Sequence, residues 1–307
     1  MTRQLVLVHG RAQERKDAIA LKREWLDALR QGLAKSDLGL PIAEDDVRFP
    51  FYGDTLSDMV RGLSPGEAAE VVVRGDAADA DEKRFISAVM EEVQRKTGIT
   101  DGEIAAVAGE DVAERGPQHW EWVHAFLKAV DRFVPHGSGA SIALFTRDVY
   151  SYLKNEVIRR GIEEGVASAI TPGVETIVVS HSLGTVVSYN VLRREGRARG
   201  WNVPLFVTLG SPLAITEIRR ALRSAGPARC PECVGSWFNA LDDRDVVALY
   251  PLDTSCFPLD PSEPAIVNKT DVRNRTPNRH GSDGYLDDKD VAFRIYEALM
   301  RGIPHHQ

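Results

Sequence analysis

Short continuous runs of apolar and β-branched residues recur along the chain, and polar or glycine-containing segments bound each of them. Runs of this kind are typical of strands that are covered on both faces of a parallel sheet. We therefore predict strands within residues 4–10, 46–53, 175–182, 203–212, 236–243 and 264–272.

Helical periodicity fills most of the intervals between these runs. After the first run, apolar residues recur at helical spacing in a segment that contains Leu21, Trp25 and Leu29. Further helical patterns cover residues 184–195, 213–224 and 290–302. Strands that alternate with helices imply right-handed crossovers, so the predicted class is α/β, with a doubly wound and mostly parallel sheet.

The interval from 54 to 146 interrupts this alternation. It contains helical patterns and no convincing strand, and residues 118–134 carry an apolar stripe formed by Val123, Phe126, Leu127, Val130, Phe133 and Val134. We predict that residues 1–53 and 147–307 form the α/β core and that residues 54–146 form an inserted helical cap. α/β folds bind ligands at the carboxyl edge of the sheet, so the cap is expected there. A peripheral helical decoration with no part in binding is the alternative.

Charge and composition exclude several classes of protein. The formal net charge of -7 provides no overall positive field for a nucleic acid. Three cysteines in 307 residues argue against a disulfide framework and fit a reducing compartment. The first ten residues contain too few apolar residues for a signal peptide, and no run approaches the roughly 18 apolar residues of a membrane span. We expect a cytoplasmic protein; transient membrane contact and the oligomeric state stay open.

Cys230 and Cys233 form a C-P-E-C motif that resembles half of a zinc site. A structural zinc site needs four ligands, and no second C-x-x-C or paired histidine motif follows at a suitable spacing. A disulfide within the loop is an equally open interpretation of the motif. We predict no metal and no cofactor.

The stretch ETIVVSHSLGTVVSYNVL, residues 175–192, predicts a strand that enters a helix almost without a loop. Ser182 is at the corner, and Ser180 and Gly184, two positions away on either side, are small enough for such a sharp turn. A corner of this kind exposes the serine hydroxyl at the top of the sheet. Ser182 is therefore the candidate nucleophile.

A serine nucleophile requires a base, and the base requires a group that orients it. The expected order along the chain is serine, acid, histidine, with each partner in a loop that follows a later strand. Asp245, which precedes an apolar V-V-A turn, is the preferred acid, and Asp242 is the next choice. His280, in a polar loop before the last helix, is the candidate base. His9 is expected to brace the first turn.

Backbone N–H groups near the corner can serve as an oxyanion hole. Leu183 follows the serine directly, and Arg11 follows His9 and Gly10 at the end of the first strand. The N–H groups of Leu183 and Arg11 are expected to point at the same carbonyl oxygen of a substrate. Two donors of this kind stabilise a transition state by about 3–4 kcal/mol each.

The motifs LVHGR, SHSLGTVV, LGSP, NALDDRDVVA and RHGSDGYL together resemble those of the α/β-hydrolase superfamily, most of all its bacterial serine esterase and lipase branch. The resemblance implies a catalytic triad of Ser182 as nucleophile, Asp245 as acid and His280 as base, with Arg11 and Leu183 at the oxyanion hole. In two respects the chain departs from the pattern. Ser180 replaces the first glycine of the turn, and the two leading antiparallel strands of the full fold are missing.

The function expected from these residues is the hydrolysis of a carboxylic ester, with a lipid or another acyl ester as substrate. Two alternatives remain open at this stage. The same triad could transfer an acyl group to an acceptor other than water, or the chain could be a non-catalytic protein-binding module on a hydrolase fold. Acyl chain length and leaving group are not set by the sequence.

Overall fold

The computed structural model describes residues 3–10, 17–52, 80–224 and 226–301. Its centre is a six-stranded sheet in which every strand is parallel to its neighbours. The strands are β1 (Gln4–Val8), β2 (Val47–Arg48), β3 (Glu175–His181), β4 (Asn202–Leu209), β5 (Trp237–Ala240) and β6 (Ile266–Lys269). Five of these strands lie within predicted runs, and β4 begins one residue before its predicted run at 203–212, so the α/β class and the parallel sheet are confirmed.

The strand order β2-β1-β3-β4-β5-β6 contains one reversal of direction. The chain passes outward from β1 to β2 and then returns to place β3 on the other side of β1. In open α/β sheets, ligands bind outside the carboxyl ends of the strands at such a switch point. The ends of β1 and β3, at Val8 and His181, therefore mark the expected place of a site.

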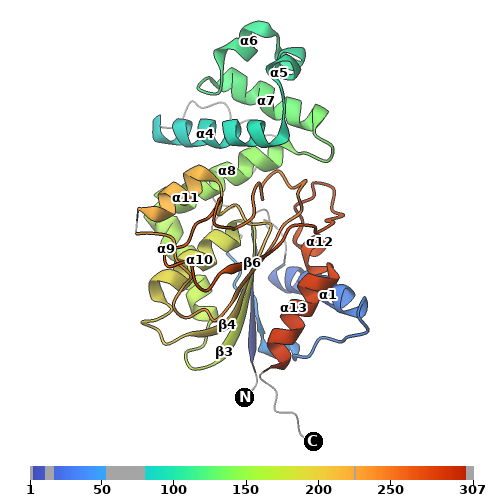
Figure 1. The fold of residues 1–307 in the computed structure, drawn as a ribbon, viewed down its shortest axis with the longest axis vertical. Helices are drawn as coiled ribbons and strands as arrows, with labels where there is room; N and C mark the ends of the chain where they lie inside the picture. Colours follow the sequence, from blue (N-terminus) through green and yellow to red (C-terminus); the bar gives the residue numbers. More distant parts are fainter. Residues whose placement is uncertain (1–2, 11–16, 53–79, 225, 302–307) are drawn as a thin grey trace, which may run out of the picture.

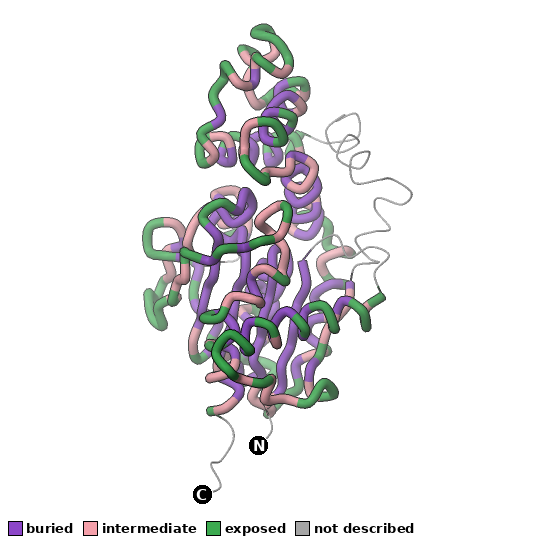
Figure 2. The backbone as a smooth tube through the Cα atoms, turned by 90° about the vertical axis from the view of Figure 1, so that its right-hand side faces the viewer, coloured by how far each residue is buried: buried purple, intermediate pink, exposed green. Residues whose placement is uncertain are grey.

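Alternate residues of the strands belong to two separate hydrophobic cores. Leu5 and Leu7 of β1 lie in the core formed with α1 (Ala18–Ala34) and α13 (Lys289–Met300). Val6 and Val8 lie in the core on the opposite face, which includes α10 (Leu183–Glu195). Because successive strand residues point to opposite faces, a fully apolar run is what two covered faces require. In Figure 2 the strands at the centre of the sheet are buried over almost all of their length.

Helices cover both faces of this sheet (Figure 1). Helix α12 (Ser282–Leu286) lies with α1 and α13 on one side, while α9 (Glu156–Ala169), α10 and α11 (Thr216–Arg223) lie on the other. Helix α8 (Gly139–Lys154) links the second group to the helices above, and it crosses the boundary predicted at residue 146. Within the described ranges, no helix has the length and apolar character needed to span a membrane.

Four helices lie beyond the carboxyl ends of the strands, and we call residues 80–133 the helical layer (Figure 1). They are α4 (Ala80–Thr97), α5 (Asp101–Ala108), α6 (Glu110–Arg115) and α7 (Trp120–Phe133). The predicted stripe of α7 faces inward, because Val123, Phe126, Leu127 and Val130 are buried, and α7 packs on α8. The stripe is therefore part of the core.

One buried carboxylate joins the helical layer to the sheet domain. Glu92 of α4 is 4% exposed and accepts hydrogen bonds from the backbone N–H of Thr216 at 3.0 Å and from its hydroxyl at 3.1 Å. Thr216 is the first residue of α11, where free N–H groups and the helix dipole favour a negative charge. Lys96 of α4 also lies 5.3 Å from the ring centre of Tyr250.

Candidate active site

Ser182 lies at the corner between β3 and α10, as predicted, and its backbone is strained. Its φ of 53° and ψ of -127° lie in a region that residues other than glycine avoid, at a cost of about 1–3 kcal/mol. Hydrogen bonds on both sides hold this conformation. The N–H of Ser182 donates to the carbonyl of Leu209 at 3.0 Å, and its own carbonyl accepts from the N–H of Thr185 at 2.9 Å.

The corner packs so closely against the end of β1 that two positions admit only glycine. A Cβ at Gly184 would lie 2.4 Å from the carbonyl oxygen of His9, and a Cβ at Gly10 would lie 2.7 Å from Cβ of Ser182. Ser180, which stands where hydrolase motifs have glycine, is accommodated because its hydroxyl donates to Ser188 on α10 at 2.7 Å.

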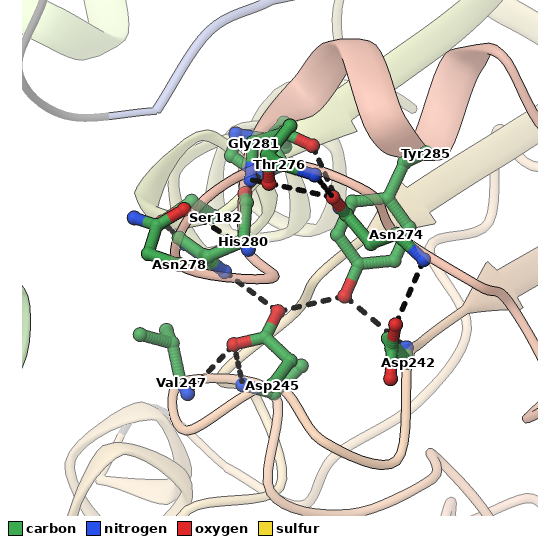
Figure 3. Close-up of polar contacts among 12 residues, drawn as sticks. Ser182, Asp242, Asp245, Val247, Asn274, Thr276, Asn278, His280, Gly281 and Tyr285 are labelled. Atoms are coloured by element: carbon green, nitrogen blue, oxygen red, sulfur yellow. Dashed lines mark hydrogen bonds and ion pairs between the residues drawn. The ribbon is translucent and has the colours of Figure 1, made fainter. Parts of the chain in front are cut away.

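The structure brings the three predicted catalytic side chains into one hydrogen-bonded chain (Figure 3). The Oγ of Ser182 lies 2.8 Å from Nε2 of His280, and Nδ1 of His280 lies 2.7 Å from Oδ2 of Asp245. The carboxylate can only accept, so Nδ1 carries the ring proton and the Nε2 lone pair faces the serine hydroxyl. This is the tautomer in which a histidine can act as a base toward a serine.

Asp245 is held by the turn that follows it. Its side chain is fully buried, and its Oδ1 accepts from the backbone N–H groups of Val247 at 2.8 Å and Ala248 at 3.3 Å. The apolar V-V-A sequence packs this turn into the core, which is the signal that favoured Asp245 in the sequence. Its Oδ2 accepts from His280 and also from the hydroxyl of Tyr285 at 2.7 Å.

Asp242, the second choice of acid from the sequence, plays a different part. It is fully buried and accepts from Nε of Arg244 at 2.8 Å and from the N–H of Asn274 at 2.8 Å. Burial alone would raise the pKa of Asp242, but these hydrogen bonds outweigh burial and lower the pKa below its ordinary value. Asp242 therefore pairs with Arg244 in its own loop and joins this loop to that of Asn274 by a hydrogen bond, and its carboxylate makes no hydrogen bond to His280 in the described structure.

Two further histidines brace the site. The backbone N–H of Tyr52 donates to Nε2 of His9 at 3.2 Å, and Nδ1 of His9 lies 2.6 Å from the carbonyl of Gly10. Burial lowers the pKa of His9 to about 4. His181, next to the nucleophile, places Nε2 2.7 Å from the carbonyl oxygen of His280, and burial lowers its pKa well below the ordinary value.

The sequence did not reveal the contacts that His181 and Tyr285 make with the triad. His181 is next to the nucleophile in the sequence, but its bond to the backbone of His280 depends on where a loop 99 residues away returns. Tyr285 lies within the RHGSDGYL motif, but it precedes the last predicted helix at 290–302 and was not singled out. Nothing in the motif indicates which acid its hydroxyl meets.

The proposed oxyanion donors are described only in part. Leu183 is the first residue of α10, where backbone N–H groups have no partner within the helix. Its N–H is thus available at the end of the helix nearest the nucleophile. Arg11 lies outside the described residues.

A cavity of about 770 Å³ opens beside Ser182 and His280. Its walls come from α1, from the start of α8 and from the loop between β6 and α12. The carboxylates among its lining residues are Glu24, Asp27, Asp283 and Asp287, and Arg275 adds a cationic group. None of the described residues of the helical layer lines this cavity, while Ser141 and Phe145 of α8 do.

The cysteines are free thiols in this structure, so Cys230 and Cys233 form no disulfide. Burial raises the pKa of Cys230 to about 12 and that of Cys233 to about 11. Among the residues that the structure describes, no group of three His, Cys, Asp or Glu side chains is arranged to hold a metal ion.

Comparison of the chain with protein-family models, with curated proteins and with solved structures finds no match.

Proposed function

We propose that this protein is a serine hydrolase that cleaves a carboxylic ester through an acyl-enzyme on Ser182. The observation that carries the proposal is the unbroken hydrogen-bond chain from Ser182 through His280 to Asp245, at 2.8 and 2.7 Å. The motifs that resemble the α/β-hydrolase superfamily, and a parallel sheet with the serine at its switch point, support the same conclusion. In this proposal residues 54–146 correspond to the inserted cap.

In the first half of the reaction, Oγ of Ser182 attacks the ester carbonyl carbon and passes its proton to Nε2 of His280. Buried Asp245 stabilises the resulting imidazolium through Nδ1. The tetrahedral oxyanion is held by the N–H of Leu183 and by a second donor from the turn after β1. When the intermediate collapses, Nε2 returns the proton to the departing alkoxide, which leaves as an alcohol.

In the second half, water replaces the alcohol. His280 removes a proton from this water while the oxygen attacks the acyl carbon, and the same proton then restores the hydroxyl of Ser182 as the acid leaves. The cavity beside Ser182 and His280 gives water a route to the acyl carbon, because both residues line it and the side chain of His280 is 13% exposed.

The cavity favours a short or polar acyl ester over a long-chain lipid. The apolar stripe of α7, the feature of the predicted cap that could favour a lipid, is buried against α8 and is not available to an acyl chain. The cavity walls include four carboxylates and several polar loop residues. A long hydrocarbon would displace water from these charged groups without replacing its hydrogen bonds.

The proposal is tested by labelling and by kinetics. A fluorophosphonate probe should modify Ser182 in the wild type, as located by mass spectrometry of peptides, and Ser182→Ala should remain unlabelled. With p-nitrophenyl esters from acetate to palmitate, we expect the fastest turnover for short acyl groups. Ser182→Ala should lower kcat on the order of 10⁴-fold or more.

Ser168→Ala is the matched control, because Ser168 is an exposed serine of α9 whose hydroxyl donates only to Gly165 in the described structure. It should keep wild-type activity. Wild-type turnover in folded Ser182→Ala, or a label on another residue, would refute the proposal. Labelling of Ser182 without ester hydrolysis, followed by product formation when alcohols or amines are added, would identify an acyltransferase instead.

A further inference from the structure

Tyr285 connects the two buried acids of the site. It lies on α12, its side chain is fully buried, and it follows His280 by five residues. Its hydroxyl lies 2.7 Å from Oδ2 of Asp245 and 3.2 Å from the backbone nitrogen of Asp242 (Figure 3). His280 and Tyr285 thus reach the same carboxylate oxygen from one short segment of chain.

The direction of the hydroxyl proton follows from its neighbours. A backbone N–H can only donate, so the hydroxyl of Tyr285 accepts from Asp242 and its single proton is directed to Asp245. Burial, followed by the negative charge of Asp245, raises the pKa of Tyr285 well above its ordinary value. The phenol therefore remains a donor throughout the pH range of the protein.

With this bond, the carboxylate of Asp245 has a donor for each of its main acceptor directions. Oδ1 accepts from the N–H groups of Val247 and Ala248, and Oδ2 accepts from His280 and Tyr285. Four donors fix the plane of the carboxylate. They also share its negative charge, so that the charge on Oδ2 interacts with Tyr285 as well as with His280.

We propose that Tyr285 is a positioning residue for the reaction, whose hydroxyl fixes Oδ2 of Asp245 at Nδ1 of His280 and weakens the attraction of this carboxylate for a protonated His280. This inference rests on the proposed hydrolase function. Tyr285 acts through Asp245 and does not itself face the substrate cavity.

Tyr285→Phe removes the hydroxyl and keeps the ring. The ring is tightly packed, since a Cβ at Gly210 would lie 2.9 Å from its Cε2, so phenylalanine should occupy the same space. Asp245 then loses one donor and can turn away from the ring of His280. We expect kcat to fall about tenfold, which corresponds to one neutral hydrogen bond.

The same substitution should move the acidic limb of the kcat/KM profile to higher pH. A carboxylate with one donor fewer attracts an imidazolium more strongly, so the ring of His280 stays protonated, and inactive as a base, to a higher pH. The expected shift is about 0.5–1 pH unit. A role limited to packing would lower activity equally at every pH.

The other ionisable groups around His280 are unchanged by the substitution. The centre of the His181 ring lies 4.8 Å from that of the His280 ring. The Asp242–Arg244 ion pair is next to Tyr285, whose hydroxyl accepts from the N–H of Asp242. Across the cavity, the charged side chains are Glu24, Asp27, Arg275, Asp283 and Asp287. A shift in the acidic limb is therefore due to the Tyr285–Asp245 bond.

The experiment compares Tyr285→Phe with Tyr152→Phe. Tyr152 is the matched control, because it is also fully buried and its hydroxyl donates to a buried carboxylate, Glu163, at 2.8 Å, away from the triad. pH profiles are measured with p-nitrophenyl acetate on the full chain. In parallel, the protein labelled with ¹⁵N-histidine is titrated by NMR without substrate, with His280 assigned from the spectrum of His280→Asn.

We expect the acidic limb and the NMR midpoint of His280 to move upward together in Tyr285→Phe, and neither to move in Tyr152→Phe. Unchanged midpoints in folded Tyr285→Phe, or an equal shift in the control, would overturn the inference. If Tyr285→Phe does not fold, 3-fluorotyrosine at position 285, a stronger donor of nearly the same shape, should move both midpoints downward. If Ser182→Ala is as active as the wild type, the hydrolase proposal fails, while the NMR titration still tests Tyr285.

Discussion

The carboxyl edge of the sheet and the helical layer use burial in opposite ways. At the edge, the buried side chains are charged or polar, and Asp242 and Asp245 are fully excluded from solvent while each accepts several hydrogen bonds. In residues 80–133 the buried side chains are almost all apolar, as in the stacked pair of Trp122 and Phe126, whose ring centres lie 5.3 Å apart. The polar exceptions among the described residues are Ser87 and Glu92, and Glu92 lies where α4 meets α11.

This contrast indicates that the two regions contribute differently to stability and to the geometry of the site. Buried carboxylates contribute little net stability, because removing them from water costs about as much as their partners return. They hold a fixed geometry, which is what catalysis needs. Apolar burial stabilises the folded state in proportion to the area removed from water, but it orients no hydrogen-bond donor or acceptor. Substitutions of the proposed catalytic residues at the edge should therefore change chemistry, while those in the helical layer should change stability.

The largest effect should come from Asp245→Asn. The asparagine oxygen will face the N–H groups of Val247 and Ala248, which leaves the amide N–H₂ toward Nδ1 of His280. The ring must then carry its proton on Nε2, where it cannot accept from Ser182. We expect kcat to fall about 10⁴-fold, with the unfolding midpoint changed only slightly. Ester hydrolysis and thermal unfolding measure the two quantities.

Asp242→Asn is the counterpart within the same region. It leaves Arg244 without its charged partner, and we expect lower stability with less than a tenfold change in kcat. Should Asp242→Asn abolish turnover while Asp245→Asn remains active, the assignment of the triad acid is wrong.

Phe126→Ala should show the opposite pattern. Phe126 is fully buried in the helical layer and packs on Trp122, so its removal leaves a cavity that costs about 3–5 kcal/mol. Activity per folded molecule should stay near that of the wild type, because the described helical layer does not line the substrate cavity. Urea unfolding and active-site titration with the fluorophosphonate separate stability from chemistry.

Val157→Ala is the control for this variant, since Val157 on α9 is 81% exposed and its truncation should cost less than about 0.5 kcal/mol. A large loss of kcat in folded Phe126→Ala would show that the helical layer takes part in the reaction, and the contrast between the regions would not hold.

Most of the sheet could be predicted because its signals are local. Buried strands need apolar residues on both faces, so β1, β3 and β4 stand out as continuous runs. The run at 46–53 was predicted to be longer than the two-residue β2, which lies at the edge of the sheet and pairs only with β1 among the described strands. The convergence of Ser182, Asp245 and His280 could be predicted because parallel strands bring the loops that follow them to one edge of the sheet.

The rest of the site depends on where distant segments meet. Nothing near Asp242 in the sequence shows that the backbone of Asn274, 32 residues later, binds its carboxylate, and the sequence left Asp242 and Asp245 as alternatives. The cavity has the same origin, because its acidic wall combines α1 with a loop some 250 residues later. Periodicity does indicate that the α7 stripe is apolar, but it does not distinguish a stripe that binds lipid from one that packs on α8.

The smallest effect expected here is a pH dependence of stability that arises at the edge of the sheet. The pKa of His9 is about 4 in the folded protein, because of burial, and about 6.5 in an unfolded chain. Protonating Nε2 would also remove the lone pair that accepts from the N–H of Tyr52, so this hydrogen bond would be lost.

Between pH 6.5 and 4 the unfolded state binds a proton at His9 and the folded state does not. The stabilising contribution is therefore complete above pH 6.5 and is lost as the pH falls toward 4, and His9 alone should lower the free energy of unfolding by about 2 kcal/mol from pH 7.5 to pH 5.

His9→Gln should remove this part of the slope, because the amide oxygen of glutamine can still accept from Tyr52 but does not titrate. Urea unfolding at pH 7.5 and pH 5 measures the change, and the exposed His136→Gln serves as the control. The wild type and His136→Gln should both lose about 2 kcal/mol more than His9→Gln over this interval. Equal losses in all three proteins would mean that His9 accepts a proton without unfolding. The edge of the sheet would then be less rigid than its buried hydrogen bonds imply, and its contrast with the helical layer would rest on the triad alone.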